Sequence, residues 1–203
     1  MLSSNIVEGA CPRCGLSPCF AKNEEFIEWL AYLRGLDDHA LVLVATSRID
    51  EQITRLLKKL LLPDPDAKES NPNSDNLFGF SRPLGTFSSK INLAIRLQLV
   101  SKELGKLVDD LRDFRNKFAH SPKILTLDNQ TFSARIANHL VYAEGCPIYP
   151  KMMRVRTMGG IDDSNKSKFL RITIIASLSL ELAIAHAVLP IPEFVVDGAM
   201  LDS

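Results

Sequence analysis

The sequence predicts an all-α fold, a helical bundle of about six helices, and three observations support that prediction. Apolar residues recur at spacings of three and four in several segments, which places them along one face of a helix. Ser, Thr, Asp or Asn precedes most of these segments, and such a side chain can accept a bond from an unpaired backbone N–H. Proline or glycine ends most of them, and few segments have the alternating pattern of a strand.

The composition is that of a globular protein without a dominant charge. The chain has 203 residues, with 24 Lys+Arg and 24 Asp+Glu, so no overall field attracts nucleic acid or an anionic membrane. The start lacks a basic segment followed by an apolar run, so we expect no signal peptide and a cytoplasmic protein. We divide the chain into a cysteine-containing leader (1–23), a helical bundle domain (24–190) and a loose tail (191–203).

The first two helices are predicted from the residues that begin them. Asn23 caps a short helix, and Asp37 opens a long helix that runs to about Leu62. The apolar residues of the long helix share an inner face: Ala45, Ile49, Ile53, Leu56, Leu57 and Leu60. Asp50 lies at the edge of this face, and the polar stretch 63–75 that follows is typical of a loop.

A compact turn, residues 77–87, leads into the next helix. Thr86 can cap that helix, which we expect to run to about Leu99. We expect Phe80 and Phe87 to pack inside the turn. The alternative is that the turn is a binding site, in which the free N–H groups at the start of the helix hold an anion.

The stretch from Ser101 to His120 is predicted to form one amphipathic helix that Ser101 caps. Its apolar face contains Leu104, Leu107, Val108, Leu111, Phe114, Phe118 and Ala119. Arg115 projects near the middle of that face, and Asn116 and His120 share a row beside it. Because a charge that faces a core needs a partner, we expect Asp50 to pair with Arg115 unless the three polar residues form a site.

Two weaker features follow this helix. Asp128 or Asn129 can cap a further short helix. The segment 141–160 then changes character, and we expect Val141–Tyr142 to pair with Met153–Val155 as a small hairpin insertion.

The last predicted helix is the most apolar segment of the chain. Ser164 starts it and Pro190 ends it. Its apolar run is long enough to span a bilayer, but Glu181 lies within it, and a carboxylate is costly in lipid. We therefore expect a helix buried in the bundle and no membrane partner.

Three of the four cysteines are crowded into the segment CPRCGLSPC, which contains Cys11, Cys14 and Cys19. The turn C-P-x-C-G is one that zinc knuckles use, because its glycine lets backbone amides point at the thiolates. Structural zinc usually has four ligands. The residues that could complete the site are Cys146, His39 and His139. The alternative is a leader that carries free thiols.

Four stretches resemble the mannitol operon repressor-like family: SRIDEQITRLLKKLL (47–61), RPLGTFSSKINLAIRLQLVS (82–101), LRDFRNKFAHS (111–121) and LTLDNQTFSARIANHL (125–140). Their order and spacing match that family's helix with "DE", its "PLGTFSxKI" turn and helix, and its "RNxFAHS" helix end, and the likeness covers about 37–190. The resemblance implies an all-α bundle and a part in negative transcriptional control. The cysteine segment and the 141–160 segment depart from the family pattern.

A more distant resemblance concerns chemistry. Arg115 and His120 form an R-x4-H motif at a helix end, with Asn116 after the arginine, which is similar to the HEPN superfamily of four-helix bundles. Many of those proteins are metal-independent ribonucleases that act as dimers. The resemblance implies that Arg115 would hold phosphate, Asn116 would orient it and His120 would act as general acid and base.

Three classes of function stay open. We favour a non-enzymatic regulatory or interaction protein of the mannitol repressor-like type, which acts through a protein partner or a homodimer. The first alternative is a HEPN-like ribonuclease or toxin, and the second is a binding module that carries a zinc knuckle. We expect no cofactor for the bundle itself, with a structural zinc ion as the alternative for the leader, and RNA or DNA as a partner stays open.

Overall fold

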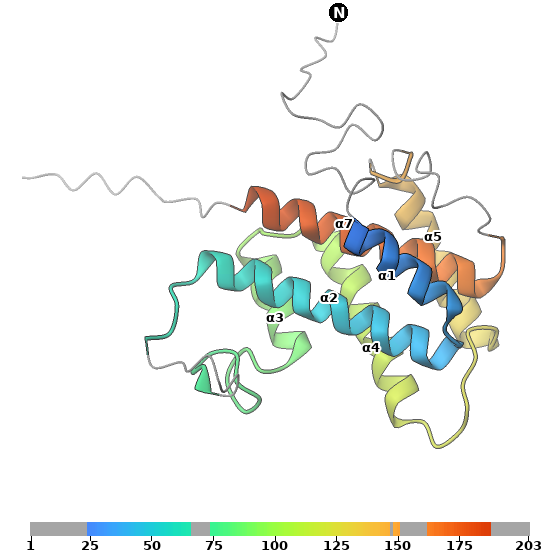
Figure 1. Cartoon of the computed structure of the whole chain (residues 1–203), viewed down its shortest axis with the longest axis horizontal. Coiled ribbons are helices and arrows are strands. Elements are labelled where there is room, and N and C mark those ends of the chain that lie inside the picture. The colour runs from blue at the N-terminus through green and yellow to red at the C-terminus, as the bar shows by residue number, and fades with distance from the viewer. Residues whose placement is uncertain (1–23, 66–73, 147, 151–161, 188–203) are drawn as a thin grey trace, which may run out of the picture.

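A computed structural model describes residues 24–65, 74–146, 148–150 and 162–187 of the chain. Within these ranges the protein forms six helices and no strand (Figure 1). The predicted all-α bundle of about six helices is therefore confirmed. The leader and the tail lie outside the described residues.

The helices are α1 (Glu24–Gly35), α2 (Asp38–Leu60), α3 (Phe87–Arg96), α4 (Lys102–His120), α5 (Gln130–Gly145) and α7 (Asn165–His186). Helix α2 packs against α1, α3, α4 and α7, and α5 packs mainly against α7. The long helices α2, α4 and α7 thus enclose the core, and the shorter helices cover its outer sides (Figure 1).

Five of the six helices begin at residues that the sequence predicts as caps. Asp37, Thr86, Ser101, Asn129 and Ser164 each accept a hydrogen bond from a backbone N–H in the first turn of the helix that follows. Each bond satisfies one of the donors that a helix start leaves without an internal partner. These caps fix where the chain enters each helix.

Two helices end at places that differ from the prediction. Helix α3 stops at Arg96, before the expected Leu99, and Gln98 has a positive φ of 56° that turns the chain toward α4. Helix α5 continues through Val141–Tyr142, so the hairpin expected at 141–160 is wrong for that half. The reason is that the apolar side of α5 facing the core continues past Tyr142, which packs against the core. The other half, Met153–Val155, lies outside the described residues.

The core contains a cluster of aromatic rings where α4, α5 and α7 meet. The centroid of Phe114 lies 5.3 Å from that of Phe132 and 5.7 Å from that of Phe169, and the centroids of Phe118 and Phe132 are 5.1 Å apart. All four side chains are buried and their planes are tilted, which is a favourable geometry for aromatic pairs. This cluster holds the second half of α4 in place.

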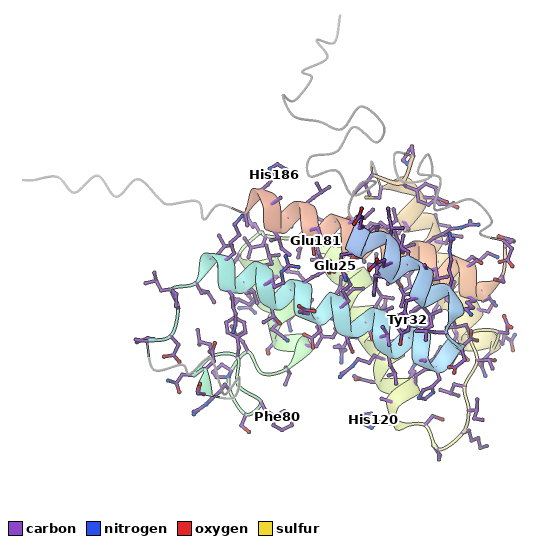
Figure 2. The ribbon with its side chains drawn as sticks, viewed as in Figure 1. Glu25, Tyr32, Phe80, His120, Glu181 and His186 are labelled. Carbon is purple, nitrogen blue, oxygen red and sulfur yellow. The ribbon has the colours of Figure 1, made fainter. Side chains whose placement is uncertain are left out.

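Helix α7 meets α2 through a row of polar contacts inside an otherwise apolar surface. The buried side-chain amide of Gln52 donates to the Ser177 hydroxyl (2.9 Å) and to the Glu181 carboxylate (2.8 Å). Arg55 pairs with the same carboxylate at 2.9 Å, and Figure 2 labels Glu181 on α7. By length and composition α7 could cross a membrane, but core helices of soluble proteins pass the same test. The Glu181 carboxylate of α7 is bonded to Gln52 and Arg55 of α2 within the bundle.

Candidate functional site

The three residues of the predicted R-x4-H site lie at the end of α4. Arg115 and Asn116 are half-buried, and His120 is exposed as the last residue of the helix. Figure 2 shows His120 at the end of α4, on the edge of the molecule. The helix thus brings Arg115 and Asn116 to the surface of the bundle, with His120 one turn further on in solvent.

The neighbouring charges on α4 are engaged in ion pairs. Arg112 pairs with Asp109 at 2.8 Å, and Lys117 pairs with Asp113 at 3.3 Å. Arg115 takes part in none of the ion pairs formed within the described ranges of the chain. Its guanidinium is therefore the cation of this helix end that remains open to a ligand.

Asp50 does not pair with Arg115, because its carboxylate forms an ion pair with Lys90 of α3. The Lys90 side chain is 10% exposed and that of Asp50 is 27% exposed. Lys90 also donates to the Thr54 hydroxyl at 2.9 Å, one turn along α2. The pair thus joins the "DE" stretch of α2 to the "PLGTFSxKI" stretch of α3, so two of the motifs that carry the family resemblance meet inside the bundle.

A polar network between α4 and α5 was not anticipated from the sequence. The Arg135 guanidinium bonds to Asp113 at 2.7 Å and to Asp110 at 2.9 Å, and it lies 4.6 Å from the centroid of the Phe114 ring. His139, one turn along α5, bonds to the other oxygen of Asp110 at 2.9 Å. Arg135 and His139 are four residues apart and so share a helical face. This spacing was visible in the sequence and could have indicated a polar contact on that face of α5.

Burial lowers the pKa of His139 below the usual value for histidine. The Asp110 carboxylate opposes this shift, while Arg135 and Lys106 add to it. His139 is therefore neutral near pH 7, and its Nε2–H donates to Asp110. The network is structural: Arg135 is shared by the carboxylates of Asp110 and Asp113, and Lys117 also pairs with Asp113.

The proposed zinc ligands fall largely outside the described residues. Cys11, Cys14 and Cys19 lie there, and Cys146 is a half-buried free thiol at the end of α5. Within the described ranges, no three side chains of His, Cys, Asp or Glu come together as a metal site. The zinc knuckle stays a prediction about the leader.

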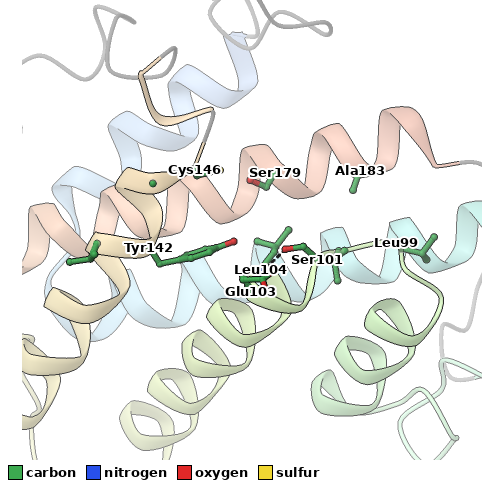
Figure 3. A pocket seen from close by; sticks show the side chains of 11 residues that line it. Leu99, Ser101, Glu103, Leu104, Tyr142, Cys146, Ser179 and Ala183 are labelled. Atoms are coloured by element: carbon green, nitrogen blue, oxygen red, sulfur yellow. Dashed lines mark hydrogen bonds between the residues drawn. The ribbon is translucent and has the colours of Figure 1, made fainter.

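A pocket of about 520 Å³ opens where the start of α4, the end of α5 and α7 converge (Figure 3). Its apolar wall consists of Leu99, Val100, Leu104, Val141 and Ala183. Its polar groups are Ser101, Glu103, Tyr142, Ser179 and Cys146. None of the R-x4-H residues lines it, so the pocket is separate from the site that the sequence predicts.

The turn before α3 presents an exposed aromatic side chain. Phe87 is buried as expected, but Phe80 is 85% exposed, so the prediction that both pack inside the turn is wrong for Phe80. We call residues 75–86 the Phe80 loop. Phe80 turns outward because Leu84, which is buried, takes the inner position of the turn.

The Phe80 loop is held by hydrogen bonds along its length. Backbone bonds run from Gly79 to Asp75 (3.0 Å) and from Leu84 to Leu77 (2.8 Å), where the first residue donates. The Asp75 side chain accepts from the N–H of Leu77 and of Phe78, each at 2.9 Å. These bonds favour a preformed loop conformation.

Close backbone packing adds to this order. A Cβ on Gly85 would lie 2.4 Å from the carbonyl oxygen of Gly79 and 2.5 Å from that of Phe80. No side chain fits there, so glycine is required by the approach of the two backbone segments. The glycine of the "PLGTF" motif thus closes the base of the loop.

Comparisons with protein-family models, with curated proteins and with solved structures find no match to this chain.

Proposed function

We propose that this protein is a non-enzymatic regulator of the mannitol operon repressor-like type, which takes part in negative transcriptional control through contacts with other proteins. The observation that carries the proposal is the Phe80 loop. An ordered loop that exposes a large aromatic ring is typical of an interaction site, because aromatic residues dominate the binding energy of protein interfaces.

The order of the loop strengthens this argument. Binding by a mobile loop loses affinity to the entropy of ordering it, whereas a preformed loop avoids most of that loss. Phe80 contributes little to the core, since 85% of its surface is exposed. The exposed arginine at position 82 lies two residues away, and no carboxylate occurs between Leu77 and Thr86. A partner protein with an apolar pocket for Phe80 and acidic side chains around it for Arg82 would suit this loop.

Two motifs of the family resemblance, the "DE" stretch of α2 and the "PLGTFSxKI" stretch, support a role in architecture. Asp50 and Lys90 form a largely buried ion pair, and Gly85 permits the close turn of the loop. Neither feature leaves a reactive group exposed. The Asp50–Lys90 pair and Gly85 therefore serve to build the bundle and to shape the loop that presents Phe80.

The test is complementation of a strain that lacks the gene, with transcript levels as the readout. Phe80→Ser removes the exposed ring, and Ile124→Ser is the matched control, because Ile124 is 92% exposed in the loop between α4 and α5. We expect a set of transcripts to rise in the deletion strain and to fall again with the wild-type protein and with Ile124→Ser. Phe80→Ser should leave them raised although the protein accumulates normally.

Two results would contradict the proposal. One is the absence of any transcript change in the deletion strain. The other is full repression by Phe80→Ser, which would show that the exposed ring does not contact the partner.

A second candidate, a metal-independent ribonuclease, is favoured by one observation. Arg115 forms no ion pair within the described ranges, and the exposed His120 lies one turn away on the same helix. A guanidinium without an ion pair and an exposed histidine near the same helix end are residue types that can act on a phosphodiester. The variant His120→Ala separates the two functions, because it removes the acid–base group and leaves the Phe80 loop intact.

A further inference from the structure

The pocket between α4, α5 and α7 has the size and lining of a small-molecule site. Its volume of about 520 Å³ lies within the range of ligand pockets, about 300–1,000 Å³. One wall is apolar, and Val141, which contributes to that wall, is 72% exposed. An uncovered apolar wall beside several polar groups favours a ligand with an apolar body and a polar end.

The pocket contains hydroxyl groups that can accept hydrogen bonds, and the Tyr142 hydroxyl also interacts with Ser101. Figure 3 shows the Tyr142 ring extending from α5 toward the start of α4, with its hydroxyl on the side of Ser101. On α7, the Ser179 hydroxyl has no hydrogen-bond partner among the described residues. Hydroxyl oxygens at Tyr142 and Ser179 can each accept a bond from a ligand.

The charge of the pocket has one sign. Glu103 is the only ionisable carboxylate or cation among its lining residues. Its own backbone N–H and the Ser101 hydroxyl lower the pKa of Glu103, so it is ionised near pH 7. Burial raises the pKa of Tyr142, which therefore stays neutral. A ligand end with donors and a positive charge fits these groups, and a carboxylate does not.

We propose that this pocket binds a small organic amine with an apolar body, of the size of an arylalkylamine. The ammonium group lies at Glu103 with the hydroxyl groups of Tyr142 and Ser179 as further acceptors. The apolar body lies against Val141 and Ala183. The proposal does not depend on the regulatory function, because the pocket and the Phe80 loop share no residue.

The test is a titration of the full-length protein with phenethylamine, followed by the NMR chemical shifts of backbone amides. Phenylacetate and 2-phenylethanol serve as the anionic and neutral probes of similar shape. We expect phenethylamine to shift amides of the pocket residues with a Kd of about 1 mM, which is typical for a ligand this small. The alcohol should bind more weakly and phenylacetate more weakly still.

Two variants locate the interaction. Glu103→Gln should weaken phenethylamine about two- to five-fold, the effect of one exposed ion pair, and leave the alcohol unchanged. Glu51→Gln is the matched control, because Glu51 is an exposed carboxylate on α2, away from the pocket. Ala183→Phe fills the pocket and should abolish binding of all three probes. If that variant does not fold, the comparison of Glu103→Gln with Glu51→Gln decides.

Three outcomes would overturn the proposal. Phenylacetate would bind as well as phenethylamine, or the shifts would scatter over exposed carboxylates without saturating below about 10 mM. The third outcome is an equal effect of Glu103→Gln and Glu51→Gln, which would reduce the binding to a general attraction between opposite charges.

Discussion

Replacing Asp50 by alanine should destabilise the bundle far more than removing an exposed carboxylate. The substitution leaves the Lys90 ammonium, on a side chain that is 10% exposed, bonded to the Thr54 hydroxyl at 2.9 Å but without its carboxylate. Breaking a fully buried ion pair costs about 3–5 kcal/mol. Because Asp50 is about a quarter exposed, we expect a loss of about 2–3 kcal/mol here.

A double-mutant cycle separates the pair from its surroundings. Lys90→Met keeps the volume of the side chain and removes its charge, so Asp50→Ala combined with Lys90→Met should lie within about 1 kcal/mol of the wild type. Asp109→Ala is the matched control, since its pair with Arg112 is more exposed and should contribute less than about 0.5 kcal/mol.

The free energies of unfolding are measured by urea denaturation followed by circular dichroism. For a domain of this size, the loss at Asp50→Ala corresponds to a fall in Tm of about 4–12 °C. A loss at Asp50→Ala no larger than that at Asp109→Ala would contradict a stabilising Asp50–Lys90 pair. A double variant as unstable as the sum of the two single variants would contradict it as well.

Three further predictions concern the Phe80 loop, the polar network between α4 and α5, and the cap of α7. Gly85→Ala should cost about 2 kcal/mol, because its Cβ would meet a carbonyl oxygen at 2.4 Å, whereas Gly35→Ala has open space around it and should be neutral or slightly stabilising. Because the pKa of His139 is lowered in the folded protein, the unfolded chain binds a proton at this histidine more readily. The free energy of unfolding should therefore fall as the pH drops below about 6.5. His139→Gln should flatten this pH dependence although Asp110 is retained. Ser164→Ala removes the cap of α7 and should cost about 1 kcal/mol.

All three are read from urea denaturation curves, with the pH series recorded for the wild type and His139→Gln in parallel. Equal effects of the two glycine substitutions would contradict the close approach at Gly85. If the free energy of unfolding of His139→Gln depends on pH as that of the wild type does, groups other than His139 cause this dependence.

The sequence predicts where helices begin better than where they end. Caps at Asp37, Thr86 and Ser101 are local signals, because the side chain bonds to the backbone two or three residues on. The ends depend on packing with distant segments. Helix α5 continues through Val141 and Tyr142 because this turn still packs against the core, and no local residue indicates that.

The candidate sites also depend on packing between distant segments, which the sequence predicts less well than local structure. Asp50 was expected to have a partner inside the bundle, and it has one, but the partner is Lys90 rather than Arg115. Lys90 lies between Phe87 and Ala94 on the buried face of α3, so its position already indicated a buried charge. Which of two cations reaches Asp50 depends on the arrangement of the helices, which spacing within one helix does not determine. The same holds for Phe80, whose exposure depends on Leu84 occupying the interior.

A ribonuclease assay distinguishes the proposed action through protein contacts from enzymatic turnover. Purified full-length protein is incubated with mixed RNA in EDTA, beside His120→Ala, after both are shown to be folded and their oligomeric state is known. We predict that neither protein cleaves RNA. Cleavage by the wild type that is lost in His120→Ala would contradict the proposal and would make Arg115 and His120 the catalytic pair.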